Sequence, residues 1–157
     1  MNIRPACQDD LHLLWEFLAM AAYEPTVAAA KAVPIVAAHL DGWQLPSDFG
    51  FVAERDGKPL GAVWARQYGD TPYLGSGSRE ITLAVHPDAR GGGIGTMLLQ
   101  AAIAEAAGRG VALWLDVRET NPAQRLYQRL GFRLVPGWVA RNRTGGLSLG
   151  MIYLGAR

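Results

Sequence analysis

The chain has 157 residues, half of them hydrophobic, and its 15 lysines and arginines nearly balance 14 acidic residues for a formal net charge of +1. These values predict one domain, residues 1–157, and argue against a nucleic-acid-binding protein, because such proteins normally carry a basic excess. With one cysteine, three scattered histidines, no basic-then-apolar leader and no apolar run near the ~20 residues that span a bilayer, we expect a soluble cytoplasmic protein without disulfide, metal or membrane partner.

The first quarter of the chain predicts two helices. Apolar side chains recur at helical spacing over 11–22, the pattern of an amphipathic helix. Asp9 and Asp10 fall in its first turn, where the helix dipole favours negative charge. Pro25 ends this helix, and the alanine-rich segment 26–38 is predicted as a second one.

The middle of the chain predicts a hairpin and a further strand. Strand-like composition recurs in three segments, over 49–54, 60–65 and 80–85. Between the first two, Asp56-Gly57 is a strong signal for a tight hairpin turn. Two loops are indicated by their Gly, Pro, Ser and Asp content, over 42–48 and 69–78.

The second half alternates helices and strands. A glycine-rich loop opens a helix, and the apolar run over 111–117, interrupted only by Asp116, predicts a strand buried on both faces. Asn121-Pro122 opens another helix with an N-cap residue and a first-turn proline, and Gly131 ends it. Two closing strands are predicted, over 132–135 and 149–154. Early hairpins followed by strand–helix–strand–helix order indicate an α+β (mixed α/β) fold with a partly parallel centre.

The loop from Arg90 to Gly95 joins a strand to a helix and has the features of an anion site. Its glycines allow consecutive backbone N–H groups to point inward without side chains in the way. The helix N-terminus behind them adds unsatisfied N–H donors and a partial positive charge. A pyrophosphate fits such a site better than a single carboxylate does.

The spacing of this loop fits poorly with the two common nucleotide-binding patterns. A Walker loop needs a lysine before its Ser or Thr, whereas Thr96 directly follows Gly95. A Rossmann loop needs a third Gly or Ala after two intervening residues, and that place falls on Thr96 or Leu98. A nucleotide-dependent kinase or dehydrogenase is therefore disfavoured.

Two motifs together resemble the GNAT superfamily of N-acetyltransferases. Residues 83–99 (LAVHPDARGGGIGTMLL) carry its acetyl-CoA core of Arg or Gln, two residues, Gly, one residue, then Gly or Ala, at Arg90, Gly93 and Gly95. Residues 121–132 (NPAQRLYQRLGF) resemble its second element. The resemblance implies the GNAT fold, a central mixed sheet of six to seven strands with flanking helices, whose splayed parallel strands hold coenzyme A (CoA). It also implies an N-acetyltransferase that moves acetyl directly from acetyl-CoA to a primary amine of a small molecule or peptide.

The resemblance assigns the CoA-binding residues as well. The pantetheine arm would bind main-chain groups of Leu83, Ala84 and Val85. The phosphates would lie on Arg90, Gly91, Gly92, Gly93, Ile94, Gly95 and Thr96. Asn121 is either a cofactor contact or only a helix cap, and Tyr127 is either the acid that protonates the leaving thiolate or a tyrosine of the core.

The acceptor side is less specified. A general base for the amine is sought among Glu80, Asp116 and Glu119. The family often places a base where Glu80 lies, Asp116 is either a base or a structural hydrogen-bond acceptor, and a surface ion pair suits Glu119 better. The acceptor pocket is expected from the first helices and the loop that carries His39, Asp41, Trp43 and Phe49, although Trp and Phe are commoner as core residues.

Three further expectations follow. The alternative function is a non-catalytic acyl-CoA-binding sensor or interaction module on the same fold. A homodimer is expected from family habit alone. Cys7 lies near the place where the family often has Ser or Thr before the first helix, so we expect the loss of one cap to cost ~1 kcal/mol locally, without effect on function.

Overall fold

The computed structural model describes residues 1–67 and 77–155, so the loop predicted over 69–78 falls almost wholly outside the described residues. In chain order the elements are β1 (Asn2–Pro5), the 3-10 turn η1 (Gln8–Asp10), α1 (Leu11–Ala21), α2 (Val27–Lys31), α3 (Pro34–Ala37), β2 (Phe49–Arg55), β3 (Lys58–Arg66), β4 (Arg79–Val85), the 3-10 turn η2 (Pro87–Ala89), α4 (Ile94–Arg109), β5 (Leu113–Arg118), α5 (Ala123–Arg129), β6 (Arg133–Arg141) and β7 (Leu147–Tyr153). Within these two ranges, no helix has both the length and the apolar character of a membrane span.

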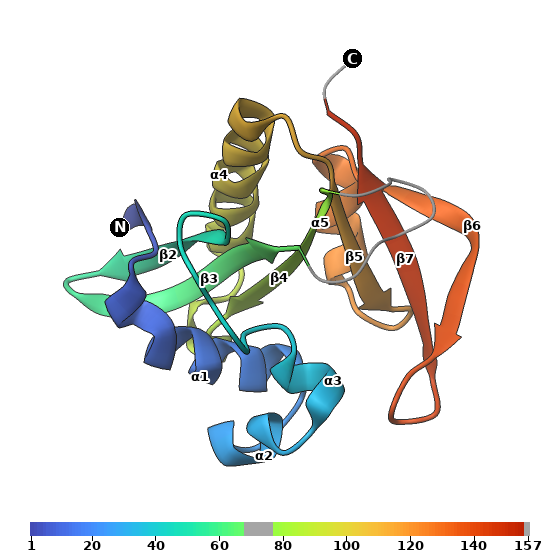
Figure 1. Ribbon diagram of the computed structural model, residues 1–157, viewed down its shortest axis with the longest axis horizontal. Coiled ribbons are helices and arrows are strands. Elements are labelled where there is room, and N and C mark those ends of the chain that lie inside the picture. Colours follow the sequence, from blue (N-terminus) through green and yellow to red (C-terminus); the bar gives the residue numbers. More distant parts are fainter. Residues whose placement is uncertain (68–76, 156–157) are drawn as a thin grey trace.

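A seven-stranded sheet in the order β1-β2-β3-β4-β5-β7-β6 forms the centre of the molecule (Figure 1). Neighbouring strands are antiparallel except β4 and β5, which run parallel. A parallel pair needs a long crossover, and α4 supplies it. These observations confirm the predicted α+β fold with a central mixed sheet and flanking helices.

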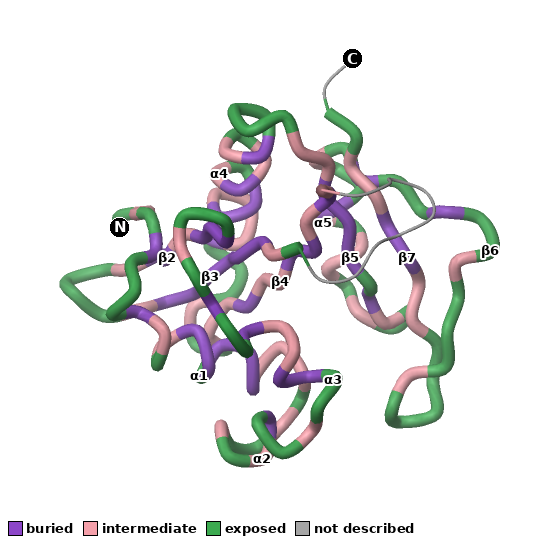
Figure 2. Tube along the Cα trace, in the orientation of Figure 1, coloured by how far each residue is buried: buried purple, intermediate pink, exposed green. Residues whose placement is uncertain are grey.

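Helices cover both faces of the sheet. Successive strand residues point to opposite faces, so Val52 and Ala62 pack beneath α1, whereas Ala53 and Val63 pack beneath α4. The buried residues accordingly follow the strands and the sheet-facing sides of α1 and α4 (Figure 2). The α1–α3 region lies on one face and α4 on the other, which leaves the junction of β4 and β5 between them (Figure 1).

The predicted hairpin between β2 and β3 is confirmed. Asp56 and Gly57 have φ angles of 53° and 75°, the left-handed values that a tight two-residue hairpin turn requires at both central positions. The strands pair from Phe49 with Ala65 to Arg55 with Lys58.

The single helix predicted over 26–38 is wrong. The segment forms two short helices, α2 and α3, because Pro34 has no N–H to continue α2 and also restricts the residue before it. Val33 is extended, with φ −104° and ψ 107°, and Pro34 then starts α3.

Several strand boundaries also differ from the sequence prediction, and one strand was not predicted. β5 begins at Leu113 rather than at residue 111, and β6 continues to Arg141 rather than ending at residue 135. β1 was not predicted as a strand, yet it pairs with β2 from Asn2 to Pro5. Four residues with one apolar side chain at their centre carry little periodic signal, and the pairing with β2 supplies the missing stabilisation.

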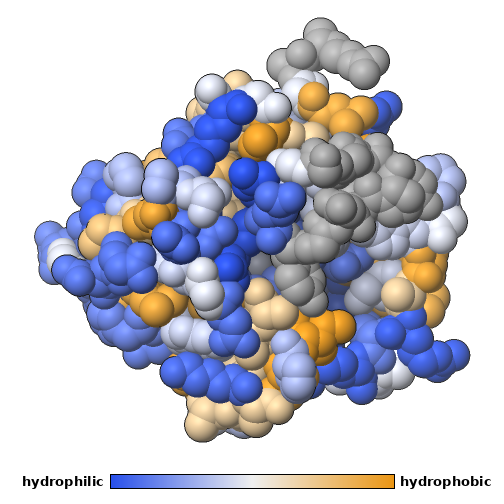
Figure 3. Space-filling model, viewed as in Figure 1, coloured by the Kyte–Doolittle hydropathy of each residue, from blue (hydrophilic) through white to orange (hydrophobic). Residues whose placement is uncertain are grey.

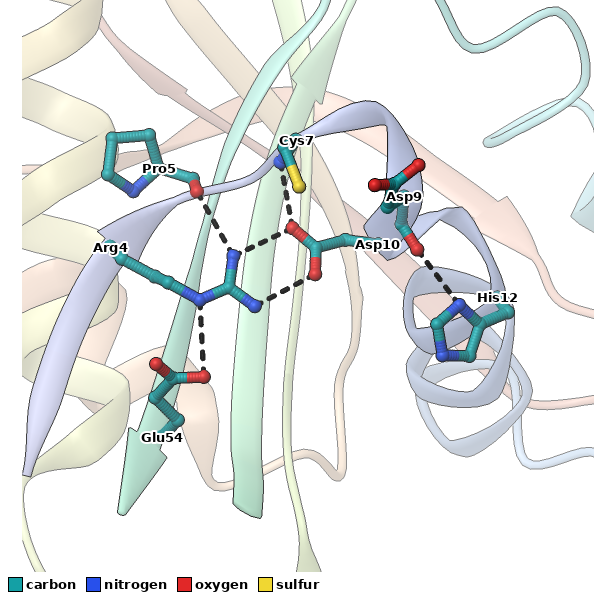
Figure 4. Close-up of polar contacts among 7 residues, drawn as sticks. All are labelled: Arg4, Pro5, Cys7, Asp9, Asp10, His12 and Glu54. Carbon is teal, nitrogen blue, oxygen red and sulfur yellow. Dashed lines mark hydrogen bonds and ion pairs between the residues drawn. The ribbon is translucent and has the colours of Figure 1, made fainter. Parts of the chain in front are cut away.

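A carboxylate ties the start of α1 to the edge of the sheet (Figure 4). Asp10 accepts hydrogen bonds at 2.8 Å from both terminal nitrogens of Arg4, and its Oδ2 accepts the Cys7 N–H at 2.7 Å. Arg4 also lies 3.1 Å from Glu54 of β2 through its Nε. The Asp10 carboxylate thus satisfies the backbone N–H of Cys7, the N-cap of the 3-10 turn η1 that leads into α1. The stability cost expected for Cys7 itself stays a prediction.

Replacing Asp10 by alanine should destabilise the protein by about 2 kcal/mol, because a partly buried bidentate ion pair and the cap of the 3-10 turn η1 are lost together. Urea unfolding measures the change. Asp9→Ala is the matched control, since the Asp9 carboxylate is exposed and only its carbonyl oxygen contacts a neighbour, His12 (Figure 4). Equal destabilisation by both variants would contradict the assignment.

The same carboxylate predicts an acid-sensitive contribution to stability. Hydrogen bonding to Arg4 lowers the pKa of Asp10 to about 2 from its ordinary value. A lowered folded-state pKa means that the contribution is complete above the unfolded-state value of ~3.9 and is lost as the pH falls towards 2. The difference in free energy of unfolding between wild type and Asp10→Ala, measured by urea unfolding, should therefore shrink as the pH falls through this range.

Candidate functional site

β4 and β5 pair only at their first residues and then separate. The parallel register joins Arg79 to Leu113 and Glu80 to Trp114, and no later pair joins the two strands. From Ile81 to Val85, β4 keeps its pairing with β3, so its other edge presents backbone groups with no partner strand among the described residues. The two strands diverge visibly from this junction (Figure 1). The predicted splay of parallel strands is therefore present.

A cavity of about 760 Å³ lies in this opening. It is walled by β4, the loop before α4, the middle of β5, the start of α5 and the α1–α3 region. Its lining includes these sequence-predicted residues: Glu80, Leu83, Ala84, Val85, Arg90, Gly91, Gly93, Ile94, Gly95, Thr96, Asp116, Asn121 and Tyr127. Gly92 is the one residue of the predicted CoA-binding set outside the lining. One cavity thus collects residues predicted separately for an anion site, a strand edge and a base.

The glycine loop has the geometry of an anion cradle. Gly91 and Gly93 have φ angles of +85° and +81°, and a Cβ added at either would meet no atom within 4 Å. Left-handed backbone of this kind suits glycine. Gly93 is the N-cap of α4, a helix of 16 residues, so the free N–H groups and the positive end of the helix dipole lie at the loop.

Arg129 is a cavity residue that the sequence analysis missed. It belongs to the last turn of α5, and its guanidinium donates to the Thr96 hydroxyl at 3.2 Å across 33 positions of the chain. The sequence around Arg129 does not predict this contact, because the contact depends on how α5 lies against the start of α4. Together with Arg90 it adds positive charge to the wall of the cradle.

For Asn121 and for Tyr127, both roles considered from the sequence are compatible with the structure. The Asn121 Oδ1 accepts the Ala123 N–H at 2.9 Å, so Asn121 does cap the helix while it also lines the cavity. Tyr127 is 8% exposed and packs edge-on against Phe132 at 5.7 Å, as a core tyrosine would. Burial raises its pKa, which keeps its hydroxyl protonated and able to donate.

A histidine–carboxylate pair stands at the narrow end of the splay. Glu80 is buried, at 6% exposed, and its Oε1 lies 2.8 Å from His39 Nδ1. His39 comes from the turn after α3, which is fixed to β3 by three hydrogen bonds. Trp64 Nε1 donates to the His39 carbonyl, and Arg66 donates to the carbonyls of Ala38 and Asp41. The imidazole is therefore held beside Glu80 by the backbone of its own turn.

Asp116 is a second carboxylate at this end. It is the exposed residue of an otherwise largely buried β5, and it opens onto the cavity. Desolvation by the surrounding walls, followed by the charge of Glu80, raises its pKa to about 6; His39 and a hydrogen bond from Trp138 act in the opposite direction. A carboxylate of this kind exchanges its proton near neutral pH, as functional sites often require.

The acceptor pocket was expected from the first helices and the loop after α3. The α1–α3 region does line the cavity, but the expectation for the loop is corrected. Only His39 lines the cavity, whereas Trp43 and Phe49 are buried in the core, and Asp41 is exposed elsewhere. The aromatic residues follow the commoner rule that large apolar side chains are buried. Glu119 is likewise exposed and outside the lining.

The cavity therefore combines three capabilities. The loop before α4 can hold phosphates, the free edge of β4 can hydrogen-bond an extended arm, and the carboxylates near His39 can bind a cation or take a proton. Across residues 1–67 and 77–155, no cluster of three or more His, Cys, Asp or Glu side chains is placed to hold a metal ion.

Residues 12–132 match the family model described as the acetyltransferase (GNAT) family. An uncharacterized N-acetyltransferase of Methanocaldococcus jannaschii is 38% identical over 100 residues, which are 57% of this chain and 42% of that protein. A mycothiol acetyltransferase of Streptomyces coelicolor is 30% identical over 128 residues, 80% of this chain and 40% of that protein. The chain thus spans about two fifths of the length of these curated relatives.

A Salmonella typhimurium structure solved with acetyl-CoA shares the fold, with a TM-score of 0.75 over 100% of this chain and 95% of that one, at 21% identity. At this identity the likeness concerns the fold alone. It supports the arrangement of sheet and helices, and the residues of the cavity carry the chemistry.

Proposed function

This chain belongs to the GNAT acetyltransferase family, and on that premise we propose that it transfers acetyl directly from acetyl-CoA to a primary amine of a small molecule or peptide. The observation that carries the proposal is the single cavity in which the glycine cradle, the free edge of β4 and the Glu80–His39 pair meet. Each of these parts suits a different part of the two substrates.

The CoA side uses backbone groups and arginines. N–H groups from Gly91 to Thr96 bind the phosphates, while Arg90 and Arg129 add charge. The pantetheine arm pairs with the unpartnered edge of β4 at Leu83 to Val85, much as a further strand would. The open space above Gly91 and Gly93 is consistent with this placement.

The amine side requires a base. An alkylamine with a pKa of ~10.4 is almost wholly protonated at neutral pH, so the ammonium must lose a proton before it reacts. Glu80, paired with His39, accepts that proton and passes it to solvent. The neutral nitrogen forms a bond to the thioester carbon, the C–S bond breaks, and the second N–H proton is lost as the sulfur gains one, giving an amide and free CoA.

Calorimetric titration with acetyl-CoA tests the first half of the proposal, and mass spectrometry of amine products tests the second. We expect saturable binding of acetyl-CoA, and a mass increase of the acceptor by one acetyl group. Failure to bind acetyl-CoA at millimolar concentration would refute the proposed function.

Tyr127→Phe should lower kcat about tenfold and leave the Kd for acetyl-CoA unchanged. The Tyr127 hydroxyl is proposed to donate to the leaving sulfur, and a thiol with a pKa of ~8.5 leaves tolerably without help, so the effect is modest. Tyr153→Phe is the matched control, since Tyr153 also packs against Phe132 but does not line the cavity. Acetyl-CoA binding without turnover in the wild type would instead indicate a sensor.

A further inference from the structure

We propose that the acceptor is a primary monoamine with an apolar substituent, bound as its ammonium ion beside Asp116 and Trp114, which Trp138 holds in place. The inference rests on the acetyl transfer proposed above and specifies the acceptor. It comes from the way three strands build one subsite at the head of the cavity.

Asp116 is held in place by an aromatic neighbour. Alternation along β5 puts Trp114 and Asp116 on the same face. The Trp138 side chain, from β6, hydrogen-bonds to Asp116, and its ring lies 5.5 Å from the Trp114 ring at an angle of 39°. Asp116 and Trp114 line the cavity, and Trp138 contacts both of them from outside its lining.

Gly150 permits this arrangement. It is the β7 partner of Asp116 in the sheet register, and Trp138 crosses directly over it. A Cβ at Gly150 would lie 1.9 Å from the Trp138 ring, so any other residue would push the indole away from β5. The sheet is thus built to bring an aromatic ring from β6 over β7 to the carboxylate.

The charge of the subsite fits one ammonium group. Glu80 and Asp116 are close enough for the charge of one to disfavour ionisation of the other, and a bound cation relieves that repulsion. The Trp114 ring, which lines the cavity, adds attraction for an organic cation. Among the described residues that line the cavity, these two are the only carboxylates, and Arg90 and Arg129 line the phosphate end. A polyamine would therefore have no site for its further charges.

The remaining wall of this end is apolar. Met20, Tyr23, Ile35 and Val36 line it from the α1–α3 region, and Tyr23 and Ile35 are each 60% exposed. Apolar side chains gather over the α2–α3 segment on this face (Figure 3). Large apolar side chains left open beside a cavity are typical of ligand-binding grooves, so we assign this wall to the substituent that carries the amine.

Comparison of 2-phenylethylamine with spermidine tests the substrate class. We expect kcat/KM to be about 100-fold higher for 2-phenylethylamine, since the apolar wall and the Trp114 ring contact it, whereas spermidine must bury unpaired charge. Equal or greater kcat/KM for spermidine would overturn the proposal. So would failure of 2-phenylethylamine both to bind the CoA-saturated protein and to be acetylated.

Variants test the subsite itself. Asp116→Asn should raise KM for 2-phenylethylamine about 10- to 100-fold, because it removes the charge that attracts the ammonium ion. Trp138→Ala should raise it about tenfold, because Asp116 and Trp114 lose the side chain that holds them in place. Val139→Ala, at the next residue of β6, is the control: Val139 is 51% exposed, and successive strand residues point to opposite faces, so its side chain points away from that of Trp138. Unchanged KM in both subsite variants would overturn the assignment.

Trp138→Phe separates the ring from its N–H. Phenylalanine keeps an aromatic ring at this position, but the hydrogen bond that lowers the pKa of Asp116 is lost. Glu80 and His39 still act on the Asp116 carboxylate in the variant. The rise of 1/KM with pH should therefore move to higher pH, and an unmoved profile would count against this role of the indole N–H. The wild type and each variant are also titrated with acetyl-CoA. A wild type that does not bind acetyl-CoA would refute the proposed acetyl transfer. Variants that bind acetyl-CoA normally and keep the wild-type KM for the amine would refute only the proposed subsite.

Discussion

Gly93→Val should weaken acetyl-CoA binding about 100-fold, equivalent to about 3 kcal/mol. Gly93 has a φ of +81° and caps α4, and a β-branched residue in this region costs roughly 1–2 kcal/mol in backbone strain. To escape that strain the loop must turn its N–H groups away from the cradle. If the loop instead keeps its shape, the new side chain enters the open space assigned to the phosphates.

Two glycines of the same chain separate these effects. Gly57 has a φ of +75° in the β2–β3 turn, so Gly57→Val carries similar strain far from the cavity and should lower stability without changing the Kd for acetyl-CoA. Gly108 lies inside α4 with no atom within 4 Å of an added Cβ, so Gly108→Ala should leave binding intact and favour the helix slightly. Calorimetry measures Kd and urea unfolding measures stability. Comparable losses of affinity in Gly93→Val and Gly57→Val would show that strain alone, rather than the cradle, sets the result.

The glycine cradle was predictable because its physics is local. Six consecutive residues, from Arg90 to Gly95, contain the left-handed positions and the helix start, and these follow from residue type and the onset of apolar periodicity. Asp116 was also visible, since one carboxylate in an apolar strand must either be paired or open onto a site. The structure shows it opening onto the cavity.

The amine side was poorly predicted because it depends on packing between distant elements. The His39–Glu80 contact joins positions 41 residues apart, and His39 points there only because Pro34 divides the predicted helix and the turn after α3 is anchored to β3. Trp138 lay beyond the predicted end of its strand, so its contact with Asp116 was invisible. Trp43 was predicted to line the pocket but lies in the core, because residue type alone does not distinguish a pocket wall from the core.

Glu80→Gln should lower kcat/KM about 1,000-fold at neutral pH, within the range typical of general-base catalysis. Glutamine preserves the volume of the buried side chain and can still contact His39, but it cannot accept the proton of the ammonium ion. Because the proposed CoA site consists of the β4 backbone and the loop before α4, the Kd for acetyl-CoA should stay unchanged. Glu54→Gln is the control, as it removes a carboxylate from the Arg4 network on the far edge of the sheet.

The pH profile identifies the role of Glu80. Without a base the variant depends on the small fraction of acceptor that is already neutral, so its kcat/KM should rise about tenfold per pH unit until the pH approaches the amine pKa of ~10.4. Wild type should level off earlier, and the gap between the two should therefore close as the pH rises. A loss that stays constant across the whole range would exclude proton removal and leave Glu80 as a charge that only orients His39 and the ammonium group.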